Sequence, residues 1–134
     1  MNKNTFDQSS VDPDLENVTE LKPNQVFVFG SNIVGNHAGG AARQAKQWGA
    51  QDGIGVGMAG QTYAIPTMSG EEVLVHYYKE FLSFAKLNLV ARKDLEFLLT
   101  PIGTGIAGYT LEDIKKLGIG DHLPSNVTKI GKWD

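Results

Sequence analysis

The chain contains no cysteine among its 134 residues. This absence excludes disulfide bonds, a thiolate nucleophile and every metal site that depends on cysteine ligands, and it suits a reducing compartment. The three histidines, His37, His76 and His122, are too widely spaced to indicate a metal site. We therefore expect neither a metal ion nor a resident cofactor.

Positive charge is also scarce. Twelve Lys and Arg residues stand against fifteen Asp and Glu residues, which gives a formal net charge of -3. A surface of this kind does not attract polyanions, so we expect neither a nucleic acid nor an anionic membrane as a partner. A single nucleotide stays compatible with the composition, because backbone amides in loops bind phosphate without an excess of basic side chains.

Long apolar runs are missing as well. No stretch approaches the roughly 20 apolar residues that a membrane-spanning helix needs. The polar N-terminal residues 1–20 lack the apolar core of a signal peptide. These two observations predict a cytoplasmic protein.

Apolar, β-prone runs alternate with helical periodicity over residues 21–134, whereas residues 1–20 show no clean period. We therefore expect an N-terminal tail followed by one domain. Strands that alternate with helices predict an α/β fold built from βαβ units, with helices on the faces of the sheet. The expected strands are 25–29, 61–65, 95–100 and 127–130, and the expected helices are 40–48, 71–89 and 110–117.

Three residues are predicted to mark helix boundaries. Gly49 fits the C-terminal cap of the first helix, because glycine readily adopts the left-handed conformation found there. Ser69 and Thr110 fit the N-caps of the second and third helices, because a hydroxyl oxygen can accept from a first-turn amide.

Glycine, by contrast, is abundant at two strand-to-helix junctions. At the first junction, Gly30, Ser31 and Asn32 follow a strand, and Gly39 precedes a helix. At the second junction, the stretch 103–109 (Gly-Thr-Gly-Ile-Ala-Gly-Tyr) lies between a strand and a helix. Glycine lets the backbone approach an anion, and ligands in open α/β sheets bind beyond the carboxyl ends of the strands. The two loops are therefore expected to share one crevice, with Thr67 as a further lining residue.

The second loop also fits the G-x-G-x-x-G pattern, with Gly103, Gly105 and Gly108. A dinucleotide fingerprint belongs to the first βα turn of a larger fold and needs an acid about 20 residues later. Here the pattern lies in the last third of the chain, and Asp121 follows too closely. We therefore reject a nicotinamide-dependent oxidoreductase.

Taken together, the two loops resemble those of the macro domain, whose members bind ADP-ribose. In that family a strand ends in N-A-A-N and a glycine-rich segment then opens a helix; Asn32 takes the place of the second asparagine, and residues 37–42 overlie the segment. The later family loop, S-T-G-I-[YF]-G-[YF], resembles residues 103–109 more closely. The overall pattern is most similar to a divergent macro-like family of phages and Bacteroides-type bacteria.

The resemblance implies a three-layer α/β/α fold with a mixed central sheet. It also implies that the first loop holds the distal ribose of a nucleotide diphosphate-sugar and that the second loop wraps the diphosphate. The implied ligand-binding residues are Gly30, Ser31, Asn32, Gly39, Gly40, Ala41, Gly103, Thr104, Gly105, Ile106, Ala107, Gly108 and Tyr109.

The chain departs from the family at three positions. Phe29 replaces the first asparagine, Ala107 replaces an aromatic residue, and Ala42 stands where hydrolytic members have an aspartate. The family's adenine-contacting aspartate has no recognisable counterpart before Val26. The hydrolytic mechanism and adenine specificity are therefore not implied by the resemblance.

Two side chains of the loops are candidates for more than binding. His37 is a candidate general acid or base, or a phosphate ligand; the plainer interpretation is a loop tip that faces water. Tyr109 is a candidate cover for a ribose or base, or else part of the core.

Three functions are compatible with these patterns. The first is a module that binds ADP-ribose or a related nucleotide. The second is a hydrolase or phosphatase that acts on an ADP-ribose derivative, with His37 as the catalytic residue. The third is an interaction or structural domain in which the glycines serve only tight turns and close packing.

Overall fold

The computed structural model of the protein describes residues 18–134. Most of the predicted tail, residues 1–20, lies outside the described part. Val18 nevertheless belongs to the hydrophobic core, and its carbonyl oxygen accepts a 2.7 Å hydrogen bond from Nε2 of Gln44. The packed domain thus begins no later than Val18, slightly before the predicted boundary.

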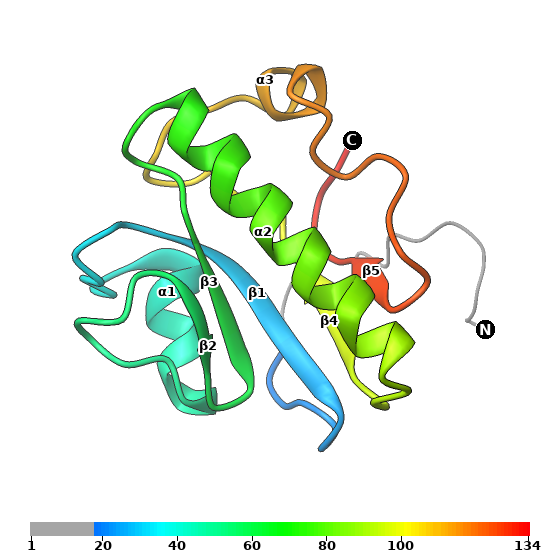
Figure 1. Ribbon diagram of the computed structural model, residues 1–134. Coiled ribbons are helices and arrows are strands. Elements are labelled where there is room, and N and C mark those ends of the chain that lie inside the picture. The colour runs from blue at the N-terminus through cyan, green and yellow to red at the C-terminus, as the bar shows by residue number, and fades with distance from the viewer. Residues whose placement is uncertain (1–17) are drawn as a thin grey trace.

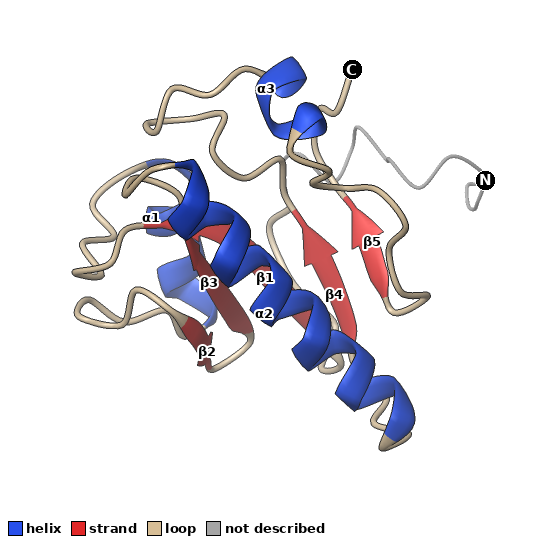
Figure 2. Ribbon diagram, turned by 45° about the horizontal axis from the view of Figure 1, so that its top comes forward, coloured by secondary structure: helices blue, strands red, loops and turns tan. Residues whose placement is uncertain are grey.

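The described residues form a five-stranded mixed sheet with helices on both faces (Figures 1 and 2). The strand order is β2-β3-β1-β4-β5; β1 is parallel to β3 and β4, β5 is parallel to β4, and β2 is antiparallel to β3. The strands are β1 (Gln25–Ser31), β2 (Gly57–Ala59), β3 (Thr62–Pro66), β4 (Glu96–Leu99) and β5 (Val127–Lys129). The helices are α1 (Gly40–Ala45), which continues into the 3-10 turn η3 (Lys46–Trp48), α2 (Glu71–Val90) and α3 (Leu111–Lys116).

Alternate residues of β1 supply two separate cores. Val26 and Val28 pack on the face that α2 and α3 cover, whereas Phe27 and Phe29 pack on the face that α1 covers. This arrangement explains why the strand is apolar on both sides of its alternation. The predicted three-layer α/β/α fold with a mixed sheet is confirmed, and Figure 1 shows α2 crossing one face of the sheet with α1 behind it.

Helix α2 forms where the predicted apolar stripe is longest. Leu74, Tyr78, Phe81 and Ala85 recur at helical spacing and are buried against the sheet. The ring of Phe81 meets that of Phe97 edge-on at 5.6 Å between centroids. No helix within residues 18–134 is both long and apolar enough to cross a membrane.

The helix boundaries confirm two predicted caps and correct a third. Gly49 ends η3 in the left-handed conformation, and Thr110 forms a capping box with Asp113. The prediction of Ser69 as an N-cap is wrong: the residue at the N-cap of α2 is Gly70, which has no side chain to accept a hydrogen bond from the first turn. Gly70 has φ of 97°, a conformation that serine rarely adopts, so the chain turns into the helix one residue later than expected.

Replacing Phe81 by alanine is expected to lower the free energy of unfolding by about 3–5 kcal/mol, because it empties a fully buried position between α2 and β4. Chemical denaturation monitored by circular dichroism measures the change. Leu87, also on α2, is 66% exposed and serves as the control, since Leu87→Ala should stay within about 0.5 kcal/mol of the parent. Equal losses for the two variants would contradict this packing.

Candidate functional site

The site lies at the carboxyl end of β1, in the middle of the sheet. The connection from β1 to β3 runs in one direction through α1, and the connection from β4 to β5 runs in the other direction through α3. Because crossovers between parallel strands are right-handed, the two connections lie on opposite faces of the sheet. The loops after β1 and β4 therefore diverge, which leaves the crevice where ligands bind in open α/β sheets.

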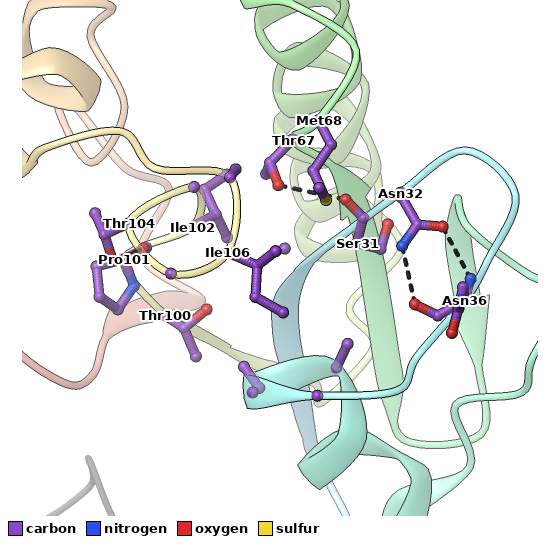
Figure 3. A pocket seen from close by; sticks show the side chains of 18 of the residues that line it. Ser31, Asn32, Asn36, Thr67, Met68, Thr100, Pro101, Ile102, Thr104 and Ile106 are labelled. Carbon is purple, nitrogen blue, oxygen red and sulfur yellow. Dashed lines mark hydrogen bonds between the residues drawn. The ribbon is translucent and has the colours of Figure 1, made fainter.

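A cavity of about 410 Å³ occupies this crevice (Figure 3). Its nineteen lining residues come from the ends of β1, β3 and β4 and from the start of α1, and none of them is titratable. They are Gly30, Ser31, Asn32, Asn36, Ala38, Gly39, Gly40, Ala41, Ala42, Thr67, Met68, Thr100, Pro101, Ile102, Gly103, Thr104, Gly105, Ile106 and Ala107.

Gly30 allows three segments to meet at the floor of the cavity. A Cβ atom added to Gly30 would lie 3.2 Å from Cγ2 of Thr67 and 3.3 Å from the backbone nitrogen of Gly103. The backbone N–H of Thr67 donates to the carbonyl of Ser31 at 2.9 Å. The two glycine-rich loops are thus in contact with the same strand end, as their shared crevice requires.

The loop after β4 presents backbone donors. Its own turns use the N–H groups of Gly108 and Tyr109, which donate to Gly105 and Gly103 at 3.0 and 2.9 Å. The consecutive N–H groups of Gly105, Ile106 and Ala107 donate to no acceptor within residues 18–134. Consecutive free amides in a tight loop can bind an anion without any charged side chain.

The side chain of Asn32 closes the loop after β1. Its Oδ1 accepts from the N–H of Asn36 at 2.8 Å, and its Nδ2 donates to the carbonyl of Asn36 at 2.9 Å (Figure 3). Both ends of the amide are therefore engaged within the loop. Asn32 lines the cavity as predicted, and its main effect is to fix the backbone around it.

Ile106 reaches across the cavity from the second loop towards the first. Its side chain is 73% exposed, yet a Cβ atom on Gly39 would lie only 3.5 Å from its Cδ1. Figure 3 shows the side chain between the two loops. An apolar group in this position narrows the cavity and shields it from water.

A third loop, residues 51–56, packs against the first loop on the side away from the cavity. Ser31 Oγ donates to the carbonyl of Gly55, and the N–H of Gly53 donates to the carbonyl of Gly35 at 2.9 Å. A Cβ atom on Gly55 would overlap the carbonyl oxygen of Asn32. This contact between loops was not predicted from the sequence, although the density of glycines after Gly49 is a signal for such close backbone contact.

His37 lies at this contact between the loops and not in the cavity. Its ring is fully buried, meets the ring of Phe29 edge-on at 5.3 Å, and bonds through Nε2 to the carbonyl of Ile54 at 2.9 Å. The interpretation of His37 as a loop tip facing water is wrong, because aromatic packing and the Ile54 carbonyl hold the ring inside. The candidate catalytic residue does not line the cavity, so this geometry gives a direct catalytic role no support.

Eleven of the thirteen predicted ligand-binding residues line the cavity, and Thr67 lines it as well. Gly108 and Tyr109 do not. Tyr109 packs against the core on the α2 side, and its Cδ2 lies 3.0 Å from the position of a Cβ on Gly103. Of the two interpretations of Tyr109, the structure supports the one that makes it part of the core, and its ring packs against the loop at Gly103.

A second cavity, of about 340 Å³, adjoins the first. The two share four wall residues, so they lie side by side. This cavity was not predicted from the sequence, because most of its other wall residues come from distant segments. The shared residues are Ala41, Thr100, Pro101 and Thr104, and the others are Phe27, Gln44, Leu111, Ile130, Gly131 and Lys132.

Comparison of the chain with protein-family models, with curated proteins and with solved structures found no match. Between Val18 and Asp134, no group of three or more histidine, aspartate or glutamate side chains is placed to hold a metal ion.

Gly55→Ala is expected to destabilise the protein by about 2 kcal/mol, because the added methyl group meets fixed backbone at Asn32. Gly105→Ala is the matched control, since its Cβ meets nothing within 4 Å. Thermal unfolding of both variants measures the difference. If Gly55→Ala unfolds at the same temperature as the control, the third loop does not support the first in the way described.

Asp52 connects the third loop to Lys46 and His37 through hydrogen bonds, and these bonds should make the stability of the protein depend on pH. The pKa of Asp52 lies below its ordinary value of 3.8 because two hydrogen bonds stabilise the carboxylate. Its Oδ2 accepts from Nζ of Lys46 at 2.9 Å, and its Oδ1 accepts from the backbone N–H of His37. A carboxylate with a lowered pKa stabilises the fold above its unfolded pKa, and this contribution disappears as the pH falls through the folded pKa.

Asp52→Asn should therefore lower the melting temperature at pH 7 and have a progressively smaller effect as the pH falls through the lowered pKa of Asp52, where the parent carboxylate is itself becoming protonated. Asp94→Asn changes an exposed carboxylate and is the control. Melting curves of the parent and both variants from pH 2.5 to 7 give the comparison. A difference between Asp52→Asn and the parent that stays constant over the whole range would contradict the assignment.

Proposed function

We propose that the protein binds ADP-ribose or a related nucleotide diphosphate-sugar in the cavity between its two glycine-rich loops. The observation that carries the proposal is the wall of the first cavity, which offers consecutive backbone N–H groups at Gly105, Ile106 and Ala107. Within the described part of the chain, residues 18–134, none of the residues that line this cavity has a titratable side chain. Its volume of about 410 Å³ falls within the range of small-molecule sites, roughly 300–1,000 Å³.

A diphosphate fits the loop after β4. Free amides bind anionic oxygens, and the positive φ of Gly103 and Gly108 lets the loop curve around a ligand. The chain carries a net charge of -3, so attraction over a long range does not explain binding. Recognition would rest on short-range geometry, which suits one nucleotide and not a polyanion.

A ribose fits the opposite side of the first cavity. There, Gly39 has no side chain to obstruct a ring, and the side chain of Ile106 is placed to cover it. The resemblance to the macro domain supports the same orientation, since it assigns the distal ribose to the first loop. The contiguous second cavity offers apolar walls at Phe27, Leu111 and Ile130 for the remaining part of the nucleotide.

The lining of the first cavity favours binding over hydrolysis. A general acid or base must come within about 2.6–3.2 Å of the proton it transfers, directly or through one water. No described residue of the first cavity has a group that titrates, and His37 lies behind the loop. The hydrolase alternative therefore has no observation in its favour among residues 18–134.

Isothermal titration calorimetry with ADP-ribose tests the proposal. We expect saturable binding that Gly105→Glu weakens at least tenfold, because the new carboxylate would occupy the space beside the free amides. Ser83→Glu places the same charge on an exposed position of α2 and should bind like the parent. No heat with ADP-ribose, NAD or AMP would refute the proposal, and release of phosphate from ADP-ribose 1″-phosphate would favour a hydrolase instead.

A further inference from the structure

Lys132 carries the only charge on the described walls of the two cavities. The first cavity has no charged lining residue, and the second has Lys132 beside apolar residues and the amide of Gln44. Its ammonium group forms no ion pair with any residue between 18 and 134, where Lys46 and Asp52 form the one pair. A cation with no ion-pair partner among residues 18–134, on the wall of an otherwise uncharged cavity, is available to a ligand that enters that cavity.

The backbone around Lys132 is held firmly in place. Ile130 and Trp133 on either side are buried, and the indole N–H of Trp133 donates to the carbonyl of Ile130 at 2.9 Å. Gly131 has φ of 82°, and a Cβ on it would lie 3.2 Å from Cδ of Pro101, a residue of both cavities. The exposed side chain of Lys132 therefore projects from a fixed point on the wall of the second cavity, next to Pro101, which lines both cavities.

We propose that Lys132 selects ligands that carry an additional phosphate on the part of the nucleotide in the second cavity. This inference rests on the proposed function, since it assumes a nucleotide that enters from the first cavity. A phosphate monoester brings close to two negative charges, and lysine binds it as a compact point charge. The net charge of the chain is negative, so this preference has a local origin at Lys132.

Two ligands that differ by one phosphate provide the test. ADP-ribose and ADP-ribose 2′-phosphate share the diphosphate and both riboses, and the added phosphate is on the ribose that carries the base. We expect the protein to bind ADP-ribose 2′-phosphate about tenfold more tightly in calorimetric titrations at low salt. The preference should shrink as the salt concentration rises, because the contact lies at an exposed side chain.

Two lysine variants separate this contact from the general charge of the region. Lys132→Gln should reduce the preference to about twofold or less. Lys129→Gln removes the same charge three residues earlier, where the ammonium lies 5.3 Å from the Trp133 ring and lines neither cavity. This control should keep the preference, and melting curves of both variants establish that they fold.

Each outcome decides between the two proposals. Equal affinity of the unsubstituted protein for the two ligands overturns the role of Lys132 and leaves the proposed function standing. An equal loss of preference in both lysine variants also overturns that role, because it assigns the effect to charge in general. If neither ligand binds at all, the proposed function fails, and the selection by Lys132 fails with it.

Discussion

Three segments of the protein meet at Gly30, where the central strand ends, and the remainder of the site follows from that meeting. Thr67 follows β3 and Gly103 follows β4, and each lies closer than ordinary van der Waals contact to the position that a Cβ atom on Gly30 would occupy. Because the strands on either side of β1 are parallel to it, all three carboxyl ends lie at the same edge of the sheet. The missing side chain lets the loops close to form one cavity.

The loops hold their shape through bonds that do not involve a ligand. Asn32 fastens the first loop to itself, and Ser31 fastens it to Gly55 in the third loop. His37 and Phe29 fill the space behind. A site preorganised in this way loses little conformational freedom when a ligand enters, which lowers the cost of binding.

The strong apolar periods of β1 and α2 made the fold largely predictable from the sequence, since burial on both faces of a sheet leaves a continuous apolar run. Strand β2 was not predictable, because its three residues, Gly57 to Ala59, carry no pattern and pair only through their backbone. In the site, the glycines indicated where the backbone comes close. The burial of His37 depends on a carbonyl seventeen residues away, a contact that no local pattern reveals. The place of Lys132 depends on the packing of the C-terminal segment against Pro101.

The wall formed by Gly105, Ile106 and Ala107 acts through its peptide groups, which are the same whatever side chains the residues carry. Substitutions there can obstruct the cavity but cannot add or remove a backbone donor, except where proline takes away an N–H. New ligand preferences in such a protein would arise from changes in loop length, which move the amides, or from residues at the margin. A new preference at the inner wall is thus expected to need an insertion or deletion, whereas a point mutation is enough at the margin.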